Sequence, residues 1–323
     1  MRPDRYSGPG RIIGRMHLLI PFASALSDAA THVLRDLPLP NLAQLLGRLT
    51  PTLRDDADPL TLSPPHERAW AAAQGWTGAD GCLPFAAQAA VADGIDVGGL
   101  AWGLVTPSHW HVGRDHVTLA DPAALQLDAA ESRAAFDAVR ELFVSEGFRF
   151  EWGATLRWYV AHDRLAQLPT ASLDRVIGRN VELWMRDTQD PLIRRLQSEL
   201  QLLLYPHALN DAREQRGALT LNSFWLSGCG RAQPADAAAV RADDALREPL
   251  LAEDWVAWAQ AWRTLDAGIV AECVQAARDG EPVTLTLCGD RNAHRFESRP
   301  QGLWQRVRAR WATSEPHIVL EAL

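Results

Sequence analysis

The chain has 323 residues, of which 47% are hydrophobic and 22% charged, and its formal net charge is −8 at pH 7. This length suffices for one large domain or two lobes with a sizeable buried core. The acidic balance argues against a nucleic-acid backbone as the main partner, because phosphate binding needs a surplus of Lys and Arg. No apolar run approaches the ~20 residues that a membrane span requires.

The first part of the chain predicts a strand followed by helices. The apolar run at residues 16–22 suits a buried strand that Pro21 closes. A helix is expected after Ser27 as its N-cap, and a second helix over residues 39–49, where leucines share one face. A third begins with Ser63 as its cap and two prolines in its first turn.

The middle of the chain, residues 103–201, reads as an α+β unit of its own. Alternating β-branched residues over 102–122 predict two strands joined by a turn at 112–114. Residues 128–147 form a clear amphipathic pattern with an acidic first turn and a final glycine, which predicts a helix. Residues 148–163 read as a hairpin.

The last part returns to alternating strands and helices. Strands are expected at 219–228 and 282–290, helices over 252–280, and a closing helix at 302–311. Together with the first part, this order predicts a parallel-sheet core formed by residues 16–102 and 202–323, into which residues 103–201 are inserted.

The two remaining features concern the start of the chain and its cysteines. Residues 1–15 are basic but lack the apolar region of a signal peptide, so we expect a disordered extension, with Met16 as an alternative start. No C-x-x-C pair occurs, and reduced thiols in the cytoplasm are the expected state of the four cysteines, Cys82, Cys229, Cys273 and Cys288.

Several stretches resemble one family. "PNLAQLL", the Pro-Pro pair that opens the next helix, and above all "YPHALNDAREQRGALTLNSFWLSGCG" resemble archaeal-type cofactor-independent phosphoglycerate mutases, members of the alkaline-phosphatase superfamily. Residues 111–163 resemble the insert domain of that family. The resemblance implies a three-layer α/β/α core with a smaller inserted α+β lobe. A narrower resemblance is to bacterial regulatory proteins of the Rpf type.

The quoted motif carries four polar residues between apolar segments. We expect them to hold the crossover from the inserted lobe into the core sheet by hydrogen bonds to loop backbone, because buried polar groups need such partners. They are His207, Asn210, Arg213 and Asn222.

The family's chemistry requires two divalent cations and a hydroxyl nucleophile between them. Its first metal ligand is an aspartate in an Asp-Gly-x-Gly-Asp pattern after the first strand, where this chain has Pro-Phe-Ala at residues 21–23. Its nucleophile follows two prolines as Gly-Ser, where this chain has His66 and Glu67. Its late Asp-His pair is Asp290 and Arg291 here, and an arginine cannot coordinate a cation.

These departures favour a catalytically degenerate relative, acting in the cytoplasm as a regulatory or ligand-binding protein without a cofactor. Its partner would be a small phosphorylated or acidic ligand, or another protein. The alternative is an active phosphoglycerate mutase or phosphatase, which would need a divalent metal such as Mn or Zn.

An anion site is one candidate within this hypothesis. Guanidinium and imidazole groups near the carboxyl ends of the core strands would bind phosphate or carboxylate by charge-assisted hydrogen bonds. The alternative is that these groups form surface ion pairs. The candidates are His66, Arg68, Asp290, Arg291, His294 and Arg295.

A metal site is the second candidate. His109 and His111 are two residues apart on a predicted strand and share one face, and His116 could return beside them, with Asp115 as a further ligand. The alternative is three half-exposed strand histidines.

The stretch at residues 169–184 is also unusually polar. Its charged residues would either line a cleft between the lobes, or belong to an ordinary helix capped by Ser172.

Overall fold

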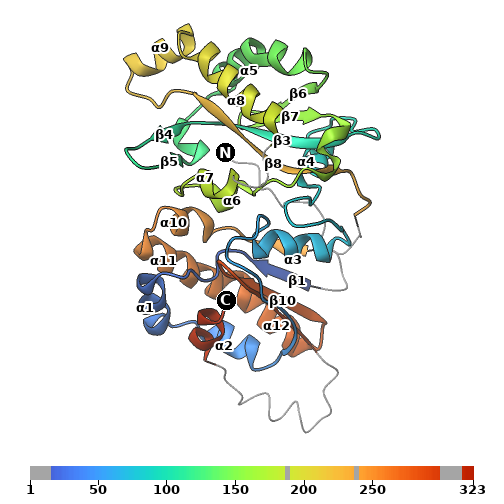
Figure 1. Ribbon diagram of the computed structural model, residues 1–323. Helices are drawn as coiled ribbons and strands as arrows, with labels where there is room; N and C mark the ends of the chain where they lie inside the picture. Colours follow the sequence, from blue (N-terminus) through green and yellow to red (C-terminus); the bar gives the residue numbers. More distant parts are fainter. Residues whose placement is uncertain (1–15, 186–189, 236–239, 299–314) are drawn as a thin grey trace. The chain divides into compact units, whose positions relative to one another are not determined.

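The computed structural model describes residues 16–185, 190–235, 240–298 and 315–323 (Figure 1). The chain forms two compact units: residues 1–59, 64–75 and 236–323 make up the first, and residues 60–63 and 76–235 the second. The second unit therefore begins earlier and ends later than the predicted insertion at 103–201. The expected extension at 1–15 and the closing helix at 302–311 lie outside the described residues.

The first unit contains a five-stranded sheet, in the order β2-β11-β10-β1-β9. Its central strand β1 pairs in parallel with β10 and with β9, whereas β11 runs antiparallel to β10 and β2. The predicted parallel core is thus a mixed sheet. The strand bounds are β1 Met16–Ile20, β2 Thr50–Asp55, β9 Val240–Ala242, β10 Val283–Cys288 and β11 Ala293–Glu297.

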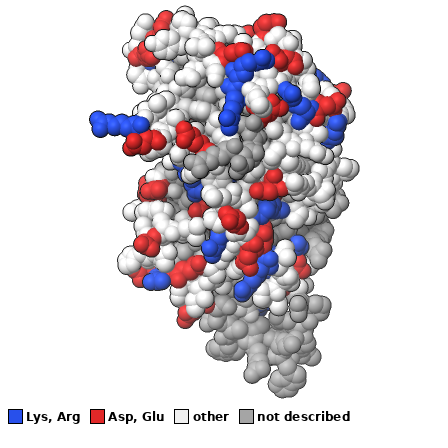
Figure 2. Space-filling model, in the orientation of Figure 1, with Lys and Arg blue, Asp and Glu red and all other residues white. Residues whose placement is uncertain are grey.

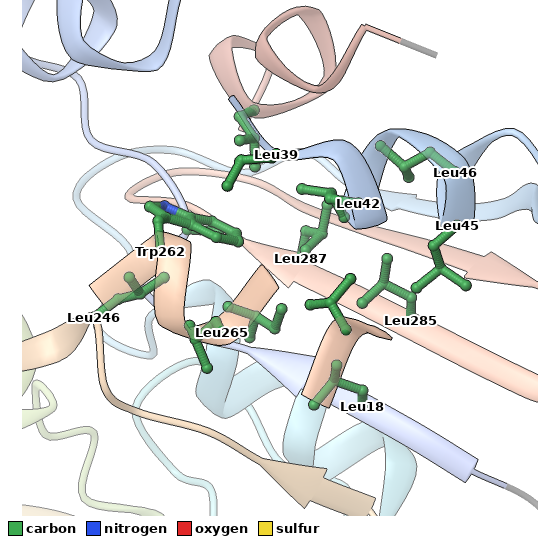
Figure 3. Close-up of a cluster of buried hydrophobic side chains, with 14 of the residues drawn as sticks. Leu18, Leu39, Leu42, Leu45, Leu46, Leu246, Trp262, Leu265, Leu285 and Leu287 are labelled. Carbon is green, nitrogen blue, oxygen red and sulfur yellow. The ribbon is translucent and has the colours of Figure 1, made fainter. Parts of the chain in front are cut away.

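Helices cover both faces of this sheet, which confirms the predicted three-layer α/β/α arrangement. Buried side chains of the sheet and of the helices on one face form the cluster shown in Figure 3. On the other face, Ala69 and Trp70 of α3 (Pro65–Ala73) pack near Leu19 and Cys288. The helices that contribute to the first cluster include α1 Asp28–Asp36, α2 Pro40–Leu46, α10 Arg247–Leu251, α11 Trp255–Leu265, α12 Ala271–Asp279 and α14 Pro316–Glu321. A π-helical segment, η3 (Asp266–Val270), joins α11 to α12.

Local sequence signals explain most of these helices. The side chain of Ser27 caps α1 by accepting a hydrogen bond from the Ala30 N–H at 3.1 Å, as predicted. The predicted role of Ser63 is wrong, because Pro64 is the N-cap residue of α3 and makes no side-chain bond. The Ser63 hydroxyl instead accepts a hydrogen bond from the Gly81 N–H in the second unit.

The second unit is built on a four-stranded antiparallel sheet, in the order β6-β7-β3-β8. α5 and α8 pack on one face and α4 on the other. The strands are β3 Ala101–Ser108, β6 Arg149–Ala154, β7 Arg157–Ala161 and β8 Ser223–Arg231, and a separate hairpin consists of β4 Trp110–Val112 and β5 Val117–Leu119. The helices are α4 Phe85–Ala92, α5 Ala129–Val144, α6 Leu173–Val176, α7 Glu182–Met185, α8 Pro191–Leu204 and α9 Ala208–Gln215, with 3-10 turns η1 Pro122–Leu125 and η2 Asp163–Gln167.

The place of β8 corrects the sequence interpretation. The strand was expected in the core sheet, but it pairs along its length with β3 in the second unit. Its run of buried residues suits either sheet, so the pattern identifies a strand without identifying its partner.

The predicted amphipathic helix and hairpin of the middle region are present as α5 and as β6-β7, and Asp128 caps α5. All four cysteines are free thiols. Among the described residues, each helix is either too short or too polar to cross a lipid bilayer.

Candidate functional site

The candidate site lies at the carboxyl edge of the first unit's sheet. The parallel strands β1, β9 and β10 all end at this edge, at Ile20, Ala242 and Cys288. Ligands of open α/β sheets bind at such edges, since the loops after the strands converge there. The start of α3 lies at the same edge, where His66 contacts Phe22 of the loop after β1.

Phe22, in the loop after β1, has an unusual backbone. Its φ of 57° lies in the left-handed region, which is strained for a bulky residue. Two hydrogen bonds fix the loop. The Phe22 carbonyl accepts one from the Trp258 indole N–H at 3.2 Å, and the Ala23 N–H donates one to the Cys288 carbonyl at 2.8 Å. The surroundings therefore hold Phe22 in a conformation that glycine would adopt at little cost.

The ring of Phe22 packs on the ring of His66, with 4.8 Å between the centroids and 39° between the planes. Both side chains are buried, at 9% and 2% exposure. The loop after the first strand and the start of the Pro-Pro helix are thus in contact, although 44 positions separate the two residues in the sequence.

Arg68 links two other parts of this edge. Its Nε donates to the Asp55 carboxylate at 2.7 Å, at the end of β2, and its Nη2 donates to the Arg291 carbonyl at 3.4 Å. The guanidinium of Arg68 therefore has a carboxylate partner. For this residue the structure shows the ion pair that the sequence left open as the alternative to an anion site.

The loop after β10 is closed by its own hydrogen bonds and by residue 323. The Gly289 N–H donates to the Asn292 carbonyl at 2.9 Å. The backbone N–H groups of Arg291 and Asn292 both donate to the Leu323 carbonyl, at 3.3 and 2.7 Å. The predicted site residues Asp290 and Arg291 thus lie in a compact turn at the carboxyl edge.

His294 and Arg295 lie on the strand after this loop and point to opposite faces of the sheet. Both belong to β11, where successive side chains point to opposite faces. His294 pairs with Leu287 and its ring contacts Phe296 on the face of the large apolar cluster, whereas Arg295 pairs with Thr286 on the α3 face. The six predicted anion-binding residues therefore do not share one face of the sheet, because His294 lies on the face opposite α3.

Charge around His294 also disfavours its cationic form. Burial lowers the pKa of His294, the positive charge of Arg54 lowers it further, and the nearby Asp56 carboxylate only partly opposes them. Elsewhere on the visible surface, acidic and basic side chains are interleaved (Figure 2). Two other arginines, Arg35 and Arg195, form ion pairs with Glu321 and Glu146.

The predicted histidine site lies in the second unit. The rings of His109 and His111 have centroids 6.4 Å apart, and His116 lies in the turn before β5, where its carbonyl accepts the Gly113 N–H. The His109 Nδ1–H donates to the Thr220 carbonyl at 2.8 Å. Within the described ranges, no three His, Cys, Asp or Glu side chains are grouped to hold a metal ion. The histidines are thus separate strand and turn residues.

The polar motif after α8 makes the backbone hydrogen bonds that the sequence predicts. Asn210 Nδ2 donates to the Leu204 and Leu221 carbonyls at 2.9 and 2.8 Å, and its Oδ1 accepts the Leu221 N–H at 2.9 Å. His207 caps α9 by accepting the Leu209 N–H. These bonds tie the α8–α9 corner to the start of β8.

Arg213 and Asn222 extend the same network. Arg213 is fully buried, donates to the Leu219 carbonyl at 2.6 Å and pairs with Glu131 at 2.8 Å. Asn222 accepts the Trp110 N–H at 2.7 Å and donates to the Trp110 carbonyl at 2.9 Å. Because β8 belongs to the second unit, these residues stabilise that unit from within and do not hold a crossover into the first sheet.

A shallow pocket in the second unit was not predicted. Its lining includes Trp184, Ile193, Gln197 and Trp225. The polar atoms of this wall bind backbone, since Gln197 Nε2 donates to the Phe224 carbonyl and the Trp225 indole to Ala171. In the sequence, this region stood out only through the polar stretch at residues 169–184. Ser172 of that stretch caps the four-residue helix α6, as one of the two alternatives predicted.

The side chains at the carboxyl edge do not suit the two-metal chemistry of the resembling family. Neither Phe22 nor Ala23 has a ligand atom, and His66 is enclosed against an aromatic ring. Arg291 carries a fixed positive charge. These positions offer no hydroxyl nucleophile and do not form the carboxylate-rich centre that two divalent cations require.

Comparisons with known proteins give only distant likenesses. No family model and no curated protein matches the sequence. A cofactor-independent phosphoglycerate mutase from Thermoplasma acidophilum is similar in structure at 14% identity and a TM-score of 0.35, over 87% of this chain and 89% of that one. The PH0037 protein from Pyrococcus horikoshii is similar at 11% identity and a TM-score of 0.42, over 92% of this chain and 93% of that one. These likenesses span most of the chain but are too weak to assign it to a family.

Proposed function

We propose that the chain is a catalytically degenerate relative of cofactor-independent phosphoglycerate mutases. In this proposal it acts as a regulatory or ligand-binding protein, and its ligand is a small phosphorylated or acidic molecule bound at the carboxyl edge of the first unit's sheet. The contact between Phe22 and His66 carries the proposal.

That contact supports the relationship to the family. The resemblance assigns the first metal ligand to the loop after the first strand and the nucleophile to the start of the Pro-Pro helix, and one active site needs both in one place. In this chain the two segments touch through rings 4.8 Å apart. The left-handed backbone at Phe22 also matches the glycine that follows the ligand aspartate in the family's Asp-Gly-x-Gly-Asp pattern.

The same contact supports the loss of the reaction. Phosphoryl transfer through a covalent intermediate needs a nucleophile activated by a metal or a base. Here Pro21 stands at the position of the ligand aspartate, and an aromatic ring fills the space beside the helix start. Metal coordination depends on several ligands together, so their replacement should abolish the reaction and not merely slow it.

The ligand class rests on the groups that remain at this edge. Arg68 and Arg291 lie beside the loop after β10, and guanidinium groups recognise phosphate and carboxylate by paired hydrogen bonds. The backbone N–H groups of Arg291 and Asn292, which bind the Leu323 carbonyl here, would be further donors once Leu323 is displaced.

Two assays test the proposal. The first measures conversion of 3-phosphoglycerate to 2-phosphoglycerate with Mn²⁺, where we expect no turnover above background. Turnover in the ordinary range of about 1–10³ s⁻¹ would instead establish the active metal-dependent alternative. The second measures 3-phosphoglycerate binding by calorimetry, with Arg68→Ala as the variant in which we expect weaker binding. Arg35→Ala, which removes a surface arginine paired with Glu321, is the matched control.

A further inference from the structure

The loop after β10 presents two adjacent backbone N–H groups to a single oxygen atom. The Arg291 and Asn292 N–H groups donate to the Leu323 carbonyl at 3.3 and 2.7 Å. The Asn292 side chain continues the contact, since its Nδ2 donates to the Ala322 carbonyl at 3.0 Å. Residues 322 and 323 are therefore held by three donors of this one loop.

Leu323 is seated closely in the first unit. Leu320 and Leu323 are buried, at 0% and 2% exposure, and belong to the large apolar cluster. A Cβ atom added to Gly289 would come within 2.6 Å of the Leu323 Cβ and 2.8 Å of its carbonyl carbon. Only glycine at position 289 leaves room for Leu323 in this place.

The donor pair has the chemistry of an anion site. Successive backbone N–H groups that point at one atom form a concavity that binds anions. A phosphate or carboxylate oxygen is a strong acceptor for such donors, because its charge strengthens the hydrogen bond. The pair also lies at the carboxyl edge of the strands, in the loop that Arg68 contacts through the Arg291 carbonyl.

We propose that the Arg291–Asn292 amide pair is an oxyanion-binding site, and that residues 320–323 are its internal competitor. This inference rests on the proposed function, because it specifies where the acidic group of the ligand binds. An oxyanion and the Leu323 carbonyl use the same two N–H groups, so each excludes the other. The apparent affinity of the ligand is then reduced by the fraction of molecules in which Leu323 is in place.

Release of Leu323 should therefore strengthen anion binding. The Gly289→Ala variant displaces Leu323 through its added methyl group, and a deletion of residues 320–323 removes the competitor itself. Gly268→Ala is the matched control, because a Cβ at Gly268 meets no atom within 4 Å. Circular dichroism and thermal unfolding establish which variants remain folded.

The experiment titrates each protein with inorganic phosphate and with 3-phosphoglycerate, and follows heat and the ¹H–¹⁵N signals of Arg291 and Asn292. We expect at least about tenfold tighter binding in a folded release variant than in the parent or in Gly268→Ala, with both amide signals shifting. In the parent, saturating ligand should replace Leu323 at the two amides and shift the same two signals.

The outcomes separate the two proposals. Equal binding by parent and release variants, with the two amide signals unmoved, would overturn the internal competitor and leave anion binding elsewhere at the edge. Binding by neither would overturn both. If both release variants fail to fold, the titration of the parent decides, since a ligand that binds without perturbing the two amides contradicts the shared site.

Discussion

Asp266 gives the sharpest stability prediction, because a single buried carboxylate caps a helix whose N–H groups lie 224 and 225 positions away in the sequence. α2 begins at Pro40 and its N-cap, Leu39, makes no side-chain hydrogen bond. Asp266 supplies the missing acceptors: Oδ1 accepts the Leu42 N–H at 2.7 Å, and Oδ2 accepts the Asn41 N–H at 3.1 Å. The carboxylate is 3% exposed, so water cannot replace it.

The magnitude follows from these bonds. Asp266→Ala leaves two backbone N–H groups of the first turn without an acceptor, and each unsatisfied buried donor costs about 1–3 kcal/mol. The negative charge near the helix N-terminus contributes further. We therefore expect a loss of about 2–4 kcal/mol in the free energy of unfolding of the first unit, and about half of that for Asp266→Asn, which keeps one acceptor oxygen.

Hydrogen exchange of the Leu42 amide measures the effect locally, and urea unfolding measures it globally. The matched control is Asp254→Ala, which removes an exposed cap that accepts one N–H, from Ala257 at 2.9 Å. That variant should lose about 1 kcal/mol and leave α2 protected. A loss at Asp266 no larger than the loss at Asp254, or an unchanged exchange rate at Leu42, would refute the capping role.

Three further predictions concern other sites. Phe22→Ala should be more destabilising than Phe22→Gly by about 1 kcal/mol, because both lose the ring but only glycine relieves the left-handed backbone. If urea unfolding shows Phe22→Gly to be the less stable variant, the backbone at Phe22 is not strained. The folded state holds the pKa of His294 below its ordinary value, through burial and then the charge of Arg54. The unfolded chain therefore takes up a proton first, and stability should fall as the pH drops below about 6.5; His294→Gln should flatten this dependence, and an unchanged slope would exclude His294 as its source. Arg213→Ala should cost about 2–4 kcal/mol, because it removes the buried donor to the Leu219 and Leu125 carbonyls while Glu131 keeps its pair with Arg216; thermal unfolding that matches the parent would show that the network contributes little.

The sequence was most informative where a local signal determines a local structure. Ser27 caps α1, Asp128 caps α5, and the apolar runs at residues 16–22 and 282–290 form neighbouring parallel strands. Such features depend on a few consecutive residues, so periodicity and capping chemistry suffice to predict them.

Features that depend on distant partners were missed. β11 carries two charged residues and a histidine, and it forms a strand because it completes a sheet between β10 and β2. If the segment were a loop, His294 and Arg295 could face one site; in a strand, their side chains point to opposite faces. The cap of α2 is equally non-local, since nothing near Leu39 in the sequence indicates Asp266. The partner of β8 could not be chosen either, because its buried pattern fits any sheet interior.

The carboxyl edge combines both kinds of information. The sequence indicates the departures at residues 21–23 and at residues 66–67 separately, as two missing functional groups. Under the proposed function the contact between Phe22 and His66 links them, because it holds the loop after β1 against the helix start that also carries Glu67. Restoring either group alone should therefore fail: an aspartate at Pro21 would lie beside the buried Phe22 ring, and a serine at Glu67 would have no metal to activate it. Only the combined changes Pro21→Asp, Phe22→Gly and Glu67→Ser would bring back both groups on the left-handed backbone that the loop already has. Metal uptake in this triple variant, measured against each single change with Mn²⁺, tests that reasoning. Uptake by any single variant at the level of the triple variant would show that the two positions are not coupled.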